Sequence, residues 1–80
     1  MKRKTDHFLD IRDSIVPYAL LKASQAFREM KRGETMEILV SDPDARKDLF
    51  RILPSACYEV IKIKDGRAFH RILLKKVLFA

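Results

Sequence analysis

A proline at position 17 stands where an extended run of residues turns into the most regular helical pattern of the chain. Proline suits the first position of a helix, because its fixed φ matches helical backbone and its missing N–H is one that the helix cannot pair. Val16 is therefore predicted to be the N-cap, although valine has no side-chain oxygen for the N–H groups of the first turn. Helix starts of this kind favour a thiolate or an anion, and here an isopropyl group stands in that place.

The segments on either side of this proline follow two different periods. Residues 7–12 alternate, with Leu9 and Ile11 on the apolar side, which predicts a short half-buried strand. Residues 17–31 place apolar side chains about 3.6 residues apart, which predicts an amphipathic helix with a basic last turn before Gly33. The apolar positions of this helix are Ala19, Leu20, Ala23, Ala26, Phe27 and Met30.

Further along, the chain repeats a strand and a helix. Residues 35–40 alternate and predict a second strand. Asp42 as N-cap and Pro43 at the first position then begin a second helix, which is expected to run to about Leu53 because Pro54 ends it. The inward positions of these two segments are predicted to be Met36, Ile38, Val40, Ala45, Leu49 and either Ile52 or Leu53.

Two more alternating runs, residues 57–64 and 67–76, are predicted to be strands joined by a hairpin at Asp65-Gly66. The apolar residues 77–80 could extend the last strand. The order is therefore strand, helix, strand, helix, strand, strand, and right-handed crossovers put both helices on the same side of the sheet. The expected fold is a two-layer α/β sandwich (βαβαββ), with a mixed four-stranded sheet and two helices on one face.

The other face of this sheet is expected to be open and to mix basic with apolar side chains. Such a face marks contact with a partner or a second copy, or is a solvated surface with scattered apolar residues. A homodimer would form through this face or through the C-terminal strand. The residues predicted on the open face are Phe8, Glu37, Leu39, Lys62, Lys64, Phe69, Arg71 and Leu73.

Length and composition bound the class of protein. Eighty residues make one domain, residues 1–80, because a second core could not be buried, and residues 1–6 are expected to be a disordered tail. No apolar run approaches the roughly 20 residues of a membrane span, and the basic start lacks the apolar core of a signal peptide. The single cysteine, Cys57, excludes an internal disulfide framework and fits a cytoplasmic location.

One set of residues, taken in order and spacing, resembles a known family. The residues are Leu9-Asp10-Ile11-Arg12, Pro17, Gly33-Glu34-Thr35, Ser41-Asp42-Pro43 and Glu59-Val60 before Asp65-Gly66. Together they resemble the TusA/SirA sulfur-carrier family over nearly the whole chain. The resemblance implies a small cytoplasmic protein that holds a persulfide on one cysteine, accepts sulfur from a cysteine desulfurase and passes it to a relay. It also implies the two-layer sandwich expected from the residues.

The chain departs from this family at the motif that carries sulfur. The family's Cys-Pro-x-Pro falls on Val16-Pro17-Tyr18-Ala19, and valine cannot hold sulfur. The resemblance thus implies a member of a sulfur-relay (sulfurtransferase) system that docks or regulates without carrying, with no catalytic residue, no cofactor and a protein partner from a sulfur-transfer or redox system. The candidate docking residues are Arg12, Asp13, Val16, Pro17, Tyr18 and Lys22.

Cys57 and the two histidines are the other candidates for chemistry. Cys57 is expected near the start of the third strand, at the end of the sheet away from Pro17, where it is either an ordinary half-buried thiol or an alternative sulfur relay. His7 and His70 have no further ligands at metal-binding spacing, so no metal site is expected. Neither a phosphate-binding glycine loop nor a serine nucleophile motif occurs.

A nucleic-acid-binding module is the alternative from another class. The formal net charge of +6 permits nucleic acid or acidic protein partners, and it could also serve solubility alone. The basic residues of the open face are Lys62, Lys64, Arg67, Arg71 and Lys75, with Tyr58 or Phe69 available for stacking. Against this hypothesis, acidic residues interrupt any continuous basic stripe, namely Asp42, Asp44, Asp48, Glu59 and Asp65.

Overall fold

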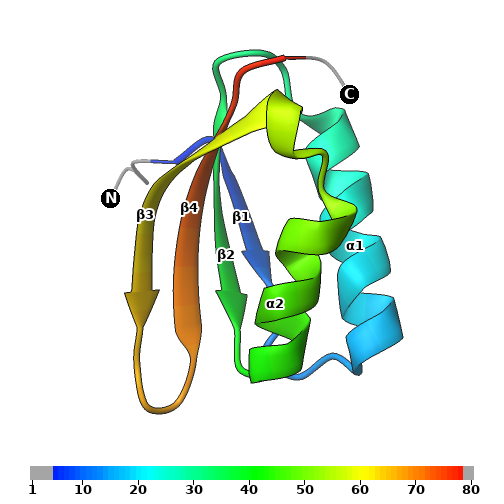
Figure 1. Cartoon of the computed structure of the whole chain (residues 1–80), viewed down its shortest axis with the longest axis vertical. Coiled ribbons are helices and arrows are strands. Elements are labelled where there is room, and N and C mark those ends of the chain that lie inside the picture. The colour runs from blue at the N-terminus through cyan, green and yellow to red at the C-terminus, as the bar shows by residue number, and fades with distance from the viewer. Residues whose placement is uncertain (1–4, 79–80) are drawn as a thin grey trace.

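A computed structural model describes residues 5–78 of the chain, apart from the side chain of Val16 (Figure 1). The elements are β1 (His7–Asp10), α1 (Val16–Glu29), β2 (Thr35–Val40), α2 (Pro43–Ile52), a 3₁₀ turn η1 (Ser55–Cys57), β3 (Tyr58–Asp65) and β4 (His70–Lys76). This confirms the expected βαβαββ order. Neither helix is long and apolar enough to cross a membrane, as far as residues 5–78 are concerned.

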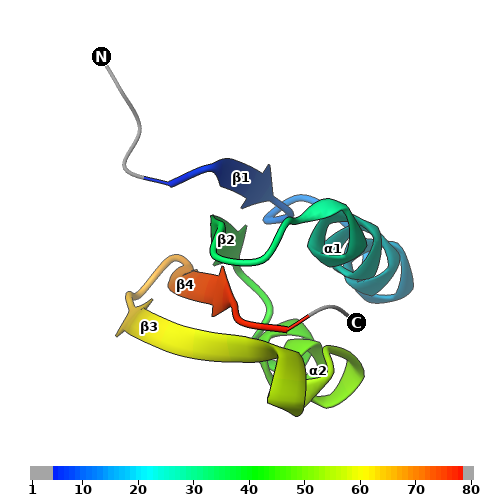
Figure 2. The ribbon, with the colours of Figure 1, turned by 90° about the horizontal axis from the view of Figure 1, so that it is seen from above.

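The four strands form one mixed sheet in the order β1-β2-β4-β3. β1 and β2 are parallel, whereas β4 is antiparallel to both of its neighbours, β2 and β3. Figure 2 shows both helices on the same face of this sheet, so the two-layer sandwich is confirmed. Because strands of the same chain occupy both edges of β4, the C-terminal strand has no edge with which a second copy could pair.

The core lies between this sheet and the helices. The inward positions predicted for β2 are all buried, and of the two alternatives at the end of α2, Leu53 is buried whereas Ile52 remains 41% exposed. Leu20 and Ala26 lie at the margin of the core and are only partly buried. The buried apolar residues of the cluster are Ile11, Ala19, Ala23, Phe27, Met30, Met36, Ile38, Val40, Ala45, Leu49, Leu53, Ile72 and Leu74.

The start of α1 lies one residue earlier than predicted. Ile15, with extended backbone (φ −70°, ψ 151°), is the N-cap, because its carbonyl accepts the first intrahelical hydrogen bond, from Ala19 N at 2.8 Å. Val16 is therefore the first helical residue rather than the cap, and Pro17 is the second. Proline is equally acceptable there, since the N–H groups of the first turn have no intrahelical partner.

The end of α1 also comes earlier than expected. The helix stops at Glu29, two residues before Lys31, because Met30 adopts extended backbone (φ −71°, ψ 141°). Gly33 then makes the turn toward β2 with φ +91°, which L side chains rarely adopt. Its N–H donates to the carbonyl of Lys76 at 2.7 Å, which ties this turn to the end of β4.

The second helix begins as predicted. Asp42 is its N-cap, and the carboxylate accepts a hydrogen bond from Asp44 N at 2.8 Å, while Pro43 occupies the first turn. α1 and α2 thus begin differently, since α2 has the side-chain acceptor that Ile15 cannot provide.

The strands beyond α2 are shifted slightly from their predicted limits. A single 3₁₀ turn takes up residues 55–57, so β3 begins at Tyr58. The hairpin is confirmed, but its loop spans residues 66–69, closed by Gly66 N donating to Phe69 O at 3.0 Å, and β4 therefore begins only at His70. β4 ends at Lys76, and the N–H groups of Val77 and Leu78 turn toward the Cys57 carbonyl. Phe79 and Ala80, expected as a further extension, lie outside the described residues.

The first strand is shorter than the predicted residues 7–12. It ends at Asp10, although Ile11 N still donates to Leu39 O at 2.9 Å. Most of the predicted disordered tail, residues 1–4, lies outside the described residues. Asp6, at the end of that segment, accepts a hydrogen bond from Thr35 N at 2.9 Å.

Candidate functional site

The start of α1 lies at the end of the molecule where several segments meet. The carboxyl ends of β1 and β2, the first turn of α1 and the β3–β4 loop all lie at the lower end in Figure 1. Ile15 makes no side-chain capping bond, so nothing from the cap residue's side chain satisfies the first N–H groups of the helix. The backbone of Val16 begins this turn, and its side chain is outside the described part of the chain.

Exposed apolar side chains surround this helix start. We call Ile15, Pro17, Tyr18 and Leu21 the α1-start patch; Ile15 is 74% exposed, Tyr18 52% and Leu21 54%. Residues three and four apart share a face of a helix, so the patch follows the outer side of the first two turns. Lys22 borders it, with Nζ 4.9 Å from the centre of the Tyr18 ring. Among the predicted docking residues, Pro17, Tyr18 and Lys22 are thus gathered together, and Ile15 and Leu21 were not predicted.

Arg12 is engaged within the chain. Its Nε and Nη2 donate to the two carboxylate oxygens of Asp10 at 2.9 and 2.7 Å, which lowers the pKa of Asp10 to about 2. The same guanidinium lies 4.9 Å from the centre of the Phe69 ring, in the β3–β4 loop. Arg12 therefore joins the chain entering α1 to the hairpin, while its neighbour Asp13 is exposed in the turn.

The face opposite the helices is less open than predicted, because one of its residues is buried. Leu39 is only 5% exposed. The sheet register puts Asp10 on one side of it and Arg71 on the other. Arg71 donates to Glu37 at 2.6 Å, and its guanidinium lies 5.9 Å from the centre of the Phe69 ring. The prediction that Leu39 lies on an exposed surface is wrong, since these long side chains cover that part of the sheet.

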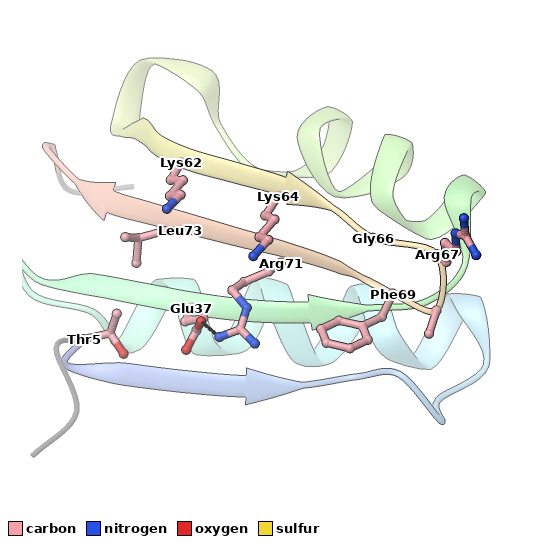
Figure 3. A pocket seen from close by; sticks show the side chains of 10 residues that line it. Thr5, Glu37, Lys62, Lys64, Gly66, Arg67, Phe69, Arg71 and Leu73 are labelled. Atoms are coloured by element: carbon pink, nitrogen blue, oxygen red, sulfur yellow. Dashed lines mark hydrogen bonds and ion pairs between the residues drawn. The ribbon is translucent and has the colours of Figure 1, made fainter. Parts of the chain in front are cut away.

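Beside this cover, the open face forms a groove of about 720 Å³ (Figure 3). Lys62 and Lys64 border it from β3, and Leu73 contributes an apolar part of its lining. Arg67 also lines the groove, and no described carboxylate lies within ion-pair distance of these three cations. The groove thus holds three of the predicted basic residues of this face, whereas Arg71 pairs with Glu37 and Lys75 lies outside the groove, opposite Glu59.

Of the two predicted stacking residues, neither offers a bare ring. Tyr58 packs toward the helices, edge-on to Phe27 with ring centres 6.0 Å apart, and this burial raises the pKa of its hydroxyl. The prediction that Tyr58 is available on the open face is wrong, because β3 turns this residue to the side of the core. Phe69 lies in the groove, with the guanidinium groups of Arg12 and Arg71 near its ring.

Cys57 lies near the other end of α1, as predicted. It is half-buried in the 3₁₀ turn and borders a hollow of about 410 Å³ together with Phe27 and Arg28. Ten residues of helix separate Phe27 from Pro17, which is roughly 15 Å along the axis. The structure therefore does not bring Cys57 to the helix start.

Both histidines make ion pairs or hydrogen bonds to carboxylates. His7 Nε2 lies 2.7 Å from Glu34 Oε1, and His70 Nδ1 lies 2.6 Å from Asp65 Oδ1. Arg46 also donates to Asp65, and these two partners together lower the pKa of Asp65, Arg46 having the larger effect. No group of three or more metal-ligating side chains occurs within residues 5–78.

A buried lysine is the main feature that the sequence analysis missed. Lys76 is 1% exposed; its Nζ donates to the Phe27 carbonyl at 2.9 Å and lies 4.8 Å from the centre of the Phe27 ring. The ammonium group thus binds a carbonyl in the last turn of α1, where a positive charge is favourable. The alternation of β4 contained the signal, since residue 76 falls on the same side as buried Ile72 and Leu74.

The fold and the helix start together define a class of protein. It is a small two-layer α/β domain whose first helix, with proline in its first turn, opens beside the carboxyl end of the first strand. A family model described as sulfurtransferase TusA matches residues 7–76. The chain belongs to the TusA sulfurtransferase family, so the predicted family is confirmed.

Individual relatives agree with this assignment. A proposed sulfur carrier protein of Archaeoglobus fulgidus is 29% identical over 69 residues, covering 86% of this chain and 94% of the relative. Among solved structures, a SirA-like protein from Desulfitobacterium hafniense has a TM-score of 0.72 at 15% identity, covering 90% of this chain and 99% of that one. A Helicobacter pylori protein has a TM-score of 0.71 at 15% identity, covering 89% and 97%. The two structures show a shared fold.

Proposed function

We propose that this chain docks to, or regulates, a protein of a sulfur-transfer system without carrying sulfur at position 16. The observation that carries the proposal is the valine at the first residue of α1, where the Cys-Pro-x-Pro motif of the family would put cysteine. Valine has no nucleophilic atom, so no persulfide can form there. The proposed location is the cytoplasm, because thiol-based transfer and a single cysteine both suit a reducing compartment.

The α1-start patch supports a docking role. Three of its side chains are more than half exposed, although apolar groups of this size are usually buried. Contiguous apolar surface of this kind is typical of protein contact sites, which have an apolar centre and a polar rim. Lys22 supplies a positive charge at that rim, so the proposed partner site is apolar with an acidic border.

Restoring the missing thiol tests the docking proposal. Val16→Cys in a Cys57→Ser background, incubated with cysteine and a cysteine desulfurase from the same genome, should gain the mass of one sulfur atom on residue 16. Adding Tyr18→Glu should remove this gain, because a carboxylate would enter the apolar patch. Arg51→Glu, on the exposed side of α2, is the matched control and should leave the gain unchanged. Failure of Val16→Cys to acquire sulfur would overturn the docking proposal.

The unmodified chain tests the claim that sulfur is not carried. With Val16 and Cys57 both present, mass spectrometry should find no added sulfur after the same incubation. A persulfide on Cys57 would instead show that the chain carries sulfur by another residue. Its position near the far end of α1 argues against this outcome, since the helix start that favours a thiolate in the family lies elsewhere.

The groove of the open face supports a second candidate, a module that binds RNA or DNA. Lys62, Lys64 and Arg67 give it positive charge, and Phe69 and Leu73 give it apolar surface. Binding to mixed tRNA should then weaken in Lys62→Glu and Lys64→Glu and persist at moderate salt. Weak binding that disappears by about 200 mM salt would contradict this candidate.

A further inference from the structure

β3 forms one edge of the sheet, and it is long and apolar for an exposed edge. It has 8 residues, whereas β1 at the other edge has 4. Val60, Ile61 and Ile63 are 40%, 48% and 38% exposed. An edge of this kind presents a row of backbone N–H and C=O groups that can pair with another strand. Its apolar side chains would lose contact with water in such a pairing.

The pairing of β3 with β4 shows which face each side chain occupies. Val60 and Ile63 lie opposite Leu74 and Ile72, which are buried under the helices. Glu59 and Lys64 lie opposite Lys75 and Arg71 instead, on the open face. Two residues five apart in a regular strand would point to opposite faces. Here they share a face, because the register shifts between Val60 and Lys62 and leaves an extra residue, Ile61.

This arrangement makes β3 complementary to itself. We propose that β3 pairs antiparallel with β3 of a second copy of this chain, about a two-fold axis that passes between Ile61 and Lys62. Tyr58 then lies opposite Asp65, Glu59 opposite Lys64, and Val60 opposite Ile63. Every residue of β3 finds a partner, and apart from the shifted centre, each pair lies on one face of the extended sheet.

The charges favour this register. Within the chain, Lys64 has Arg71 as its cross-strand neighbour, so its charge faces a like charge. In the proposed dimer it gains Glu59 of the second copy, and the symmetry forms this pair twice. Opposite charges directly across a sheet stabilise pairing, and like charges oppose it. Sliding the strands by one residue would put apolar side chains opposite charged ones on the wrong face.

Lysines and strand irregularities often discourage edge pairing, so the same features could keep β3 apart from other strands. The two effects make different predictions about charge substitutions. If the lysines only repel other strands, then removing the negative charge of Glu59 should change the association of two chains little. If Glu59 and Lys64 meet across a two-fold axis, reversing one charge breaks the dimer and reversing both restores it.

Sedimentation equilibrium of the full chain measures the association directly. Because one strand pair buries less than a standard interface, the dimer is expected to be weak, and the mass should rise from 9.4 kDa toward twice that value between about 10 µM and about 1 mM protein. Glu59→Lys should raise the dissociation constant at least tenfold. The double variant Glu59→Lys/Lys64→Glu should return it to within about threefold of the original value.

Two further variants complete the test. Lys64→Glu alone should weaken the dimer as Glu59→Lys does, because the new glutamate at position 64 would then face Glu59 of the second copy. Glu29→Lys, on the exposed side of α1, makes the same charge change away from β3 and should leave the dimer intact. A monomer at all concentrations would overturn the proposal. A dissociation constant that Glu59→Lys leaves unchanged would overturn it as well. So would a double variant whose dissociation constant does not return toward the original value. None of these outcomes depends on sulfur transfer, because no variant touches the α1-start patch.

Discussion

Replacing Leu39 with alanine should destabilise the protein as a core substitution does, although Leu39 points to the face without helices. Its side chain is only 5% exposed, and removing buried leucine methyl groups costs about 2–5 kcal/mol in well-packed sites. The cover over Leu39 consists of flexible side chains that can partly collapse, so we expect about 2–3 kcal/mol. Leu73, which lines the groove on the same face, is only partly buried, and Leu73→Ala should cost about 1 kcal/mol.

Urea unfolding of the two variants measures this difference, provided that the slope of the transition is unchanged. A double-mutant cycle with Phe69→Ala tests whether the aromatic ring contributes to the cover. If it does, the two substitutions should be non-additive by at least about 0.5 kcal/mol. Equal costs for Leu39→Ala and Leu73→Ala, both near 1 kcal/mol, would refute the argument that the polar side chains shield Leu39.

Three other predictions concern the helix ends and the surface charges. Asp42→Ala should lower the free energy of unfolding by about 1 kcal/mol and Ile15→Asn should raise it by about 0.5–1 kcal/mol, because only Asp42 supplies a capping acceptor; urea unfolding with equal signs for both would contradict this. The pKa of Asp10 lies at about 2, below its unfolded value of 3.8, so the urea midpoint should fall as the pH drops from about 4 to about 2, and less so in Asp10→Asn; an identical decline in both would contradict it. Lys76→Ala should lower the free energy of unfolding by about 2–3 kcal/mol, measured by thermal or urea unfolding, because the buried ammonium group and its bond to the Phe27 carbonyl are lost. The exposed control Lys75→Ala should lower it by less than about 0.5 kcal/mol, and equal losses in the two variants would contradict a capping role for Lys76.

Local signals in the sequence were sufficient for the order of the elements. The capping residue Asp42 and the turn residue Gly33 act through a few neighbouring backbone groups, so their roles are visible in a short window. The N-cap of α1 was misplaced by one residue because neither Ile15 nor Val16 carries a capping oxygen. Without such a side chain, the N-cap is decided by which of the two carbonyls accepts the first intrahelical hydrogen bond, and this is the carbonyl of Ile15.

The burial of Leu39 and Lys76 depends on residues far away in the chain. Leu39 is covered only because the register brings Arg71 beside it, and the β3–β4 loop returns Phe69 to the same place. Lys76 can be buried because a carbonyl in the last turn of α1 accepts a hydrogen bond from its ammonium group. Alternation along one strand predicts which face of the sheet a side chain occupies. It does not predict which distant residues cover that side chain. The exposed patch of α1 was missed for a related reason, since an apolar residue beside a core stripe looks the same whether it is covered or exposed.

The place of β4 in the middle of the sheet has a consequence for how the chain folds during synthesis. Thr35 at the start of β2 pairs with Lys75 near the end of β4, so a contact essential to the sheet joins the middle of the chain to its last strand. β4 is the strand that connects β2 to β3 in the sheet. Until His70–Lys76 have left the ribosome, β3 cannot join the sheet, and the helices can cover only β1 and β2. Folding must therefore wait for the last strand. A chain that ends before His70 should expose two strand edges and aggregate rather than form a smaller stable domain.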